Sequence, residues 1–209
     1  MSTPAETAAA EAVAAPPAAD PAPLGLAAFA LTTFLLSAAN AGWMKNASGG
    51  AWLGYAFAYG GLIQLLAGMW EFRNRNVFGA TAFSTYGGFW IGLGLWAKFI
   101  PATAAGKDVA WILLAFAIFN TYMLIWSSTL NTAIFLVFLT LEATEIVLFI
   151  GGFAGNTGIV KVGGYIGIIT ALVAWYTSAA GVGAGVTGKP ILPVGKPLMT
   201  LPSLGGSSS

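Results

Sequence analysis

The stretch VAWILLAFAIFNTYMLIWSS (109–128) contains no charged residue and is almost entirely apolar. A bilayer-spanning α-helix needs about 20 consecutive, predominantly apolar residues, and this stretch supplies them. Five further segments of similar length and composition occur along the sequence, and they cover residues 24–44, 51–71, 80–100, 133–153 and 162–183. The sequence therefore predicts an all-α integral membrane protein with six transmembrane helices.

The composition supports this prediction. Of the 209 residues, 57% are hydrophobic and 7% are charged, whereas a soluble domain carries about 25% charged residues. This balance excludes a soluble enzyme, a nucleic-acid-binding protein and a disordered protein. The sequence contains no Cys and no His, which are the commonest ligands of zinc, iron–sulfur clusters and haem. We therefore expect no cofactor, no metal, no nucleic-acid partner and no enzymatic activity.

Three regions are expected along the chain. Residues 1–20 are rich in Ala and Pro and predict a disordered tail, residues 21–185 predict the six-helix membrane domain, and residues 186–209 predict an extended or disordered tail. An even number of spans places both termini on one side of the membrane. Lys and Arg are shared equally between the two sides, but Arg73 and Arg75 both lie on the side of the termini. This weakly favours cytoplasmic termini in the plasma membrane.

Polar residues within the predicted helices indicate a pathway. Phe29, Thr33 and Asn40 share one face of the first helix, and Gln64 lies in the second. Because polar groups are costly in lipid, they face protein or water. One interpretation is a narrow path lined by hydroxyls, amides and aromatic rings. The alternative is hydrogen bonding between helices, which is typically worth less than about 1 kcal/mol for each bond.

Two carboxylates, Glu142 and Glu145, lie near the middle of the fifth predicted helix. A charged carboxylate there costs at least about 2.5–3.5 kcal/mol, so the protonated form is favoured. The pair predicts either proton binding and transfer or neutral carboxyl groups with structural hydrogen bonds, and the sequence leaves both open. A third carboxylate, Glu71, ends the second helix beside Arg73 and Arg75, where an ion pair is expected.

The segment DPAPLGL (20–26) begins the first predicted helix. Proline is suited to a helix start because its missing N–H would have no intrahelical partner there. The remaining free N–H groups and the positive end of the helix dipole could receive a carboxylate. Proline is also common at helix starts that bind nothing, so the segment leaves both interpretations open. The candidate entry residues of the path are Asp20, Pro21, Pro23, Leu24 and Gly25.

Two stretches resemble the acetate/succinate permease family, which includes bacterial succinate–acetate permeases and fungal acetate and ammonia-export proteins. DPAPLGLAAFALTT (20–33) resembles the Asn-Pro-Ala-Pro-Leu-Gly-Leu signature of that family. GGLIQLLAGMWEFRNRNVFGATAFSTYGGFW (60–90) resembles its Gln, Ala-Gly, Glu, Asn-x-Phe-Gly and Thr-Ala-Phe-x-x-Tyr-Gly pattern. A weaker similarity is GKPILPVGK (188–196), after the last helix.

The resemblance implies a hexamer of six-helix protomers, each with its own substrate path. It also implies a constriction formed by an aromatic residue, a tyrosine and a leucine, which match Phe29, Tyr86 and Leu141. The sequence departs from the family in two respects. Its signature begins with Asp20 instead of Asn, and its fifth helix carries the two glutamates described above.

Three functions remain as hypotheses. The first is a transporter or channel for small monocarboxylates, acetate and also succinate, linked to protons. The second is a channel of the same architecture for a small neutral solute such as ammonia or urea. The third, a membrane redox enzyme or photoreceptor, is disfavoured because the sequence has no Cys or His and because Lys98 lies near the end of a helix rather than at mid-membrane.

Overall fold

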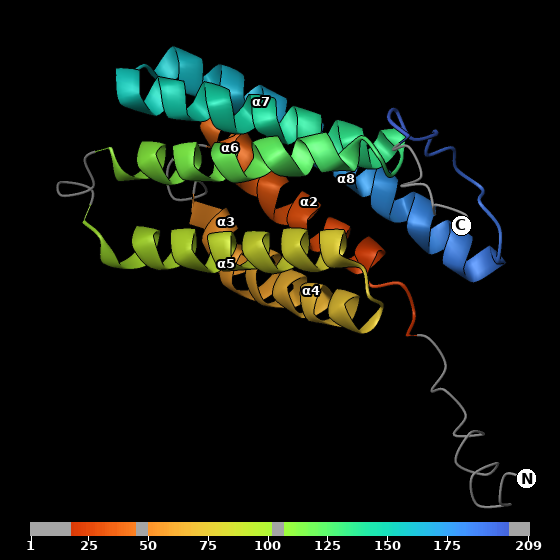
Figure 1. The fold of residues 1–209 in the computed structure, drawn as a ribbon. Helices are drawn as coiled ribbons and strands as arrows, with labels where there is room; N and C mark the ends of the chain where they lie inside the picture. The colour runs from red at the N-terminus through yellow and green to blue at the C-terminus, as the bar shows by residue number, and fades with distance from the viewer. Residues whose placement is uncertain (1–17, 45–49, 102–106, 201–209) are drawn as a thin grey trace, which may run out of the picture.

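The structure, a computed structural model, describes residues 18–44, 50–101 and 107–200 (Figure 1). Within these ranges the chain forms helices joined by short turns, and it forms no strand. The predicted all-α fold class is therefore confirmed. The parts of the predicted tails that span residues 1–17 and 201–209 lie outside the described residues.

The helices occupy the apolar segments expected from the sequence. The elements α3, η2 and α4 follow one another without a break, so that residues 51–73 form one continuous rod. In chain order the elements are α2 (Ala22–Asn40), α3 (Ala51–Phe57), η2 (Ala58–Ile63), α4 (Gln64–Arg73), α5 (Val77–Phe99), α6 (Asp108–Ser127), α7 (Thr132–Ala154) and α8 (Thr157–Thr187).

Asparagine caps set where three of these helices begin. The Oδ1 atom of Asn76 accepts from Gly79 N at 3.1 Å, and that of Asn131 accepts from Ile134 N at 2.9 Å. Asn156 accepts from two N–H groups of the first turn of α8. A side-chain oxygen at this position satisfies an N–H group that has no intrahelical partner. This cap explains why α8 begins at Thr157 rather than at the predicted residue 162.

Four of the described helices, α2, α6, α7 and α8, are long and apolar enough to cross a membrane by length and composition. Their outward faces carry large apolar side chains, including Trp111, Ile118, Leu139 and Leu172, which are each more than a third exposed. Apolar side chains on the outer surface are stable in lipid and costly in water. The chain is therefore an integral membrane protein.

Small residues bring α8 close to two neighbours. A Cβ atom on Gly163 would collide with Leu148 of α7, and one on Gly167 would collide with Ser37 of α2. Since lipid removes the hydrophobic drive between helices, such close backbone approach is a main source of helix association. By contrast, Gly88 of α5 has nothing within 4 Å of the position of a Cβ atom.

A π-helical turn, η2, interrupts the rod formed by residues 51–73. Its Gly60 lies against α2, where an added Cβ atom would be 2.6 Å from the Oγ1 atom of Thr32. Gln64 follows immediately and begins α4. A π-turn shifts the helical register of the residues after it and is frequent at functional sites. In this chain the π-turn therefore sets which way the side chains of α4, beginning with Gln64, face.

After α8 the chain runs in an extended form back over the turn between α6 and α7 (Figure 1). The carbonyl of Val194 accepts from Ala133 N at 2.9 Å, at the start of α7, and the N–H of Leu198 donates to the carbonyl of Ser128 at 2.8 Å. The hydroxyl of Tyr176 donates to the carbonyl of Pro193 at 2.7 Å. These bonds hold residues 188–200 against one end of the helical bundle.

Candidate functional site

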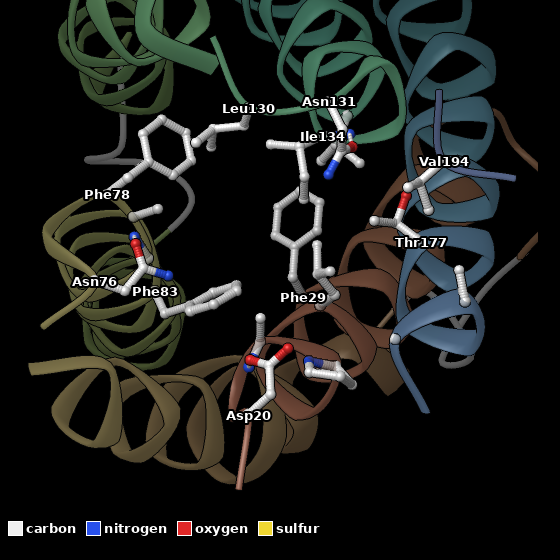
Figure 2. Close-up of a pocket in the computed structure, with 18 of the residues that line it drawn as sticks. Asp20, Phe29, Asn76, Phe78, Phe83, Leu130, Asn131, Ile134, Thr177 and Val194 are labelled. Carbon is white, nitrogen blue, oxygen red and sulfur yellow. Dashed lines mark hydrogen bonds between the residues drawn. The ribbon is translucent and has the colours of Figure 1, made fainter. Parts of the chain in front are cut away.

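A cavity of about 370 Å³ lies among α2, α4, α5, α7 and α8, and the extended segment after α8 forms part of its wall (Figure 2). Asp20, Asn76 and Asn131 line it at the points where α2, α5 and α7 begin. Three helix N-termini therefore meet at the same end of the bundle, which we call the mouth. Each brings the positive end of a helix dipole to the mouth.

Four residues form the inner end of the cavity: Phe29, Gln64, Tyr86 and Leu141. Phe29, Tyr86 and Leu141 lie two to three turns inside their helices, or about 10–14 Å from the mouth at 1.5 Å per residue. All four are buried. The rings of Phe29 and Tyr86 meet edge to face with centroids 5.9 Å apart. The structure thus brings together three residues, from three helices, that were expected to form a constriction.

The other residues expected along the path fall into two groups. Gln64 lines the cavity, at its inner end. Thr33 is buried but does not line it, and Asn40 lies at the far end of α2, where its backbone packs against Gly164 of α8. Helical periodicity placed these residues on one face of α2 but could not show that α8 covers the far half of that face.

Of the five entry residues expected from the DPAPLGL segment, some line the cavity and others do not. Asp20 and Pro23 line the mouth, and the Oδ1 atom of Asp20 accepts from Ala22 N at 2.9 Å. Pro21 lies at the N-cap of α2, Leu24 points outward and is 48% exposed, and Gly25 packs against the ring of Phe83. These three residues shape the start of α2 and do not line the cavity.

Glu145 lies behind Tyr86, in a network of hydrogen bonds outside the cavity lining. The Tyr86 hydroxyl is 3.2 Å from Glu145 Oε1 and 3.0 Å from Asn120 Oδ1. Glu142 faces α6, where it accepts from Asn120 Nδ2 at 2.7 Å and from Thr121 Oγ1 at 2.8 Å. Glu145 is therefore connected to the cavity through Tyr86, whereas Glu142 is one residue further away in the network.

Glu71 has different partners from those expected. It is 1% exposed and lines the cavity. Its Oε2 atom accepts from Asn76 Nδ2 at 2.9 Å, whereas its Oε1 atom has no hydrogen-bond partner. The expected ion pair with Arg73 or Arg75 is wrong because the chain reverses direction there, with Arg75 in the left-handed region at φ 57°. The turn presents Asn76, not an arginine, to the carboxylate.

Aromatic residues that the sequence did not single out complete the site. The ring of Tyr86 packs against Phe116 and Phe119 of α6, with centroids 5.7 and 5.5 Å apart. Nearer the mouth, the rings of Phe78 and Phe138 meet edge to face at 5.1 Å, and both line the cavity. The spacing of Phe138 and Leu141, three residues apart on α7, could have indicated that they share a face.

Known proteins resemble this chain in sequence and in structure. The profile of the GPR1/FUN34/yaaH family matches residues 5–189. Acetate permease A of Emericella nidulans is 41% identical over 197 residues, which cover 84% of this chain and 65% of that protein. The succinate-acetate/proton symporter SatP of Escherichia coli is 34% identical over 182 residues, which cover 85% of this chain and 96% of the symporter.

A solved structure, that of the bacterial acetate channel SatP, superimposes with a TM-score of 0.79 at 32% sequence identity, covering 85% of this chain and 99% of the other. The chain spans 61–65% of the length of the first fungal relatives that it matches. The resemblance inferred from the DPAPLGL segment and from residues 60–90 is confirmed: the chain belongs to the GPR1/FUN34/yaaH family.

Proposed function

We propose that this protein passes small monocarboxylates, acetate first and succinate as a larger candidate, across the membrane without chemical conversion. The observation that carries this proposal is the cavity with its buried inner end of Phe29, Tyr86 and Leu141. A volume of about 370 Å³ accommodates a short carboxylic acid with several waters, since each water occupies about 30 Å³. The relatives named as acetate and succinate transporters support the same substrate class.

The chemistry of the lining suits a carboxylate that sheds water as it enters. At the mouth, the N-termini of α2, α5 and α7 offer positive dipole ends to an anion. Further in, Gln64 supplies an amide, and then Phe29 and Leu141 close an apolar neck. A short apolar neck admits a small solute that has lost its hydration and blocks larger or strongly hydrated ones.

The charges of the lining favour transport linked to protons. Asp20 and Glu71 line the cavity, and no Lys or Arg is among its described lining residues. A carboxylate that meets these acids with no cation beside it is repelled unless a proton neutralises one partner. Glu145, bonded to Tyr86 of the neck, is our candidate for that coupling, and Glu142 has a lesser part because Asn120 separates it from Tyr86.

We extend the proposal to the architecture. The rod of residues 51–73 forms a second span and α5 a third, which gives six spans within a membrane domain of residues 21–185, with both tails in the cytoplasm and the domain in the plasma membrane. Gly88 and Gly92 of α5 have open space beside them and suit contact with another protomer in a hexamer. Cross-linking of the purified protein in lipid tests the hexamer.

Because the chain has no native Cys, single cysteines test this topology directly. Arg75→Cys and Thr129→Cys place a thiol in turns at the mouth, and Thr157→Cys places one at the opposite end. With six spans and cytoplasmic termini, an impermeant maleimide added to intact cells labels only Thr157→Cys. Labelling of all three variants, or of the first two alone, would contradict the proposed topology.

Uptake of labelled acetate into proteoliposomes tests the function. We expect uptake that saturates, that exceeds uptake by protein-free liposomes and that accelerates when the outside is acidified. Protein-free liposomes are the essential control, because neutral acetic acid crosses a bilayer unaided. Rates that match those of the empty liposomes at every pH would refute the proposal.

A neutral solute is the second candidate, and the same acidic lining favours it. Ammonia or urea avoids the repulsion that an anion meets beside Asp20 and Glu71. Stopped-flow measurements on the same proteoliposomes compare ammonia, urea and acetate. Ammonia or urea flux without protein-dependent acetate flux would favour this alternative over carboxylate transport.

A further inference from the structure

The hydroxyl of Tyr86 lies between two acceptors but has a single hydrogen. Its oxygen is 3.0 Å from Asn120 Oδ1 and 3.2 Å from Glu145 Oε1. All three side chains are at least nine-tenths buried, so that water cannot replace a missing donor or acceptor. One of the two contacts must therefore be made with a hydrogen that Tyr86 does not supply.

The orientation of the Asn120 amide decides which contact that is. Its Nδ2 atom donates to the carbonyl of Phe138 at 2.9 Å and to Glu142 Oε2 at 2.7 Å, which uses both of its hydrogens. Rotating the amide by 180° would bring its oxygen against two other oxygens. The Oδ1 atom of Asn120 is thus fixed as an acceptor, and only Tyr86 can donate to it.

Counting hydrogens then places a proton on Glu145. When Tyr86 donates to Asn120, the contact at 3.2 Å between the Tyr86 oxygen and Glu145 Oε1 needs a hydrogen from the carboxyl group. An ionised Glu145 would draw the Tyr86 hydrogen to itself and leave Asn120 Oδ1 buried without a donor. It would also leave its own Oε2 atom charged and without a partner.

We propose that Asn120 and Glu145 are positioning residues that hold the Tyr86 hydroxyl on the far side of the neck. The proton on Glu145 decides whether this hydroxyl donates to Asn120 or to Glu145. This inference rests on the proposed function only for its effect on flux. With the proton in place, Tyr86 is bonded on both sides and its ring stays against Phe29. Without it, the hydroxyl turns to Glu145 and the bond to Asn120 is lost.

The titratable groups around Glu145 are few. Tyr86 on α5 contacts it directly, and Glu142 lies on its own helix, bonded to Asn120 and Thr121 of α6. On α6, Tyr122 packs on Phe119, one ring away from Tyr86. On α8, Tyr165 packs on Trp43 and Tyr176 donates to Pro193, so these two side chains face elsewhere. The helix α2 contains no titratable side chain.

Infrared spectroscopy tests the proton without any transport. We expect the wild-type protein at neutral pH to show the C=O stretching band of protonated carboxyl groups. Because Glu71 is a second buried carboxyl group, the measurement is the difference between each variant and the wild type. Glu145→Gln should lose one component of the band, and Glu142→Gln, the same chemical change one turn away, is the matched control and should keep it. An identical band in Glu145→Gln and in the wild type, or no band in the wild type, would overturn the inference whether or not the protein carries acetate.

Flux tests the positioning role. Glutamine at position 145 donates through its amide at every pH. Glu145→Gln should therefore remove the part of the pH dependence of flux that one titrating proton imposes, and that part is at most tenfold per pH unit. In a Tyr86→Phe background, Glu145→Gln should change the profile no further, because the hydroxyl that it orients is gone. Equal effects of Glu145→Gln with and without the hydroxyl would contradict a role through Tyr86, whereas absence of acetate flux in the wild type would contradict only the proposed function.

Discussion

Two nearly inaccessible carboxylates, Glu71 near the mouth of the cavity and Glu145 behind its neck, are held in different ways. Glu71 is 1% exposed and accepts from Asn76, five residues away in the same turn. Glu145 is 3% exposed and is bonded to Tyr86, 59 residues away on another helix. The first carboxylate stabilises a local turn, whereas the second depends on three helices meeting. Burial alone therefore does not indicate what an acid in a membrane domain does.

Truncation of the neck should have the largest effect. Leu141→Ala removes buried side-chain volume, and such changes cost about 2–5 kcal/mol of folding stability. It should also widen the neck, so that uptake of propionate and butyrate rises relative to acetate. Ile134→Ala is the control and should leave the size profile unchanged, because Ile134 lines the cavity in the first turn of α7, nearer the mouth than Leu141. Figure 2 shows Ile134 among the lining residues. A wild-type size profile in Leu141→Ala would show that the neck lies elsewhere.

Removing the carboxylate near the mouth should mainly affect folding. Glu71→Leu removes the carboxylate that accepts the part-buried hydrogen bond from Asn76, and a hydrogen bond to a charged group is worth about 1.5–3 kcal/mol. Glu71→Gln keeps an acceptor oxygen and should lose much less. Thermal unfolding in detergent and the yield of assembled protein measure this difference. A well-folded Glu71→Leu protein that has lost all flux would instead place Glu71 in the transport pathway.

The helix cap at Asn76, beside Glu71, should contribute less to folding stability than the carboxylate does. Asn76→Ala removes both the acceptor for Gly79 N at the start of α5 and the donor to Glu71. Asn76→Ser keeps a capping oxygen and loses only the amide that donates to Glu71, so the difference between the two variants isolates the cap, which is worth about 1 kcal/mol. Equal unfolding temperatures for both variants and the wild type would mean that neither contact stabilises the turn.

The smallest expected effect is on the pH dependence of flux, which should differ between variants of the two carboxylates. Glu71→Gln should shift the ratio of fluxes at pH 6 and pH 8 by less than about twofold, since Asp20 still lines the cavity and Glu71 has no hydrogen bond to the neck. Glu145→Gln should reduce that ratio by more, because its carboxyl group contacts Tyr86 directly. The comparison fails if the two variants alter the ratio equally, because each acid would then act through the general charge of the cavity.

The sequence by itself determined the class of the protein. Long apolar segments and few charges allow only a helical membrane protein, because backbone groups in lipid must be satisfied within the helix. The DPAPLGL segment and residues 60–90 were specific enough to identify the family. They also located Phe29 and Tyr86, and the family pattern located Leu141; the structure brings all three to one end of a cavity.

Only the tertiary structure decided which polar side chains meet. Periodicity placed Thr33 and Asn40 on the face of Phe29, yet neither lines the cavity, because the crossing of α2 and α8 depends on contacts such as that of Gly167 with Ser37. It placed Glu142 and Glu145 one turn apart, but the partners that distinguish them, Asn120 and Tyr86, lie on other helices. The physical reason is that helix formation follows from residues within a turn of one another, whereas a hydrogen bond across the bundle depends on how whole helices pack.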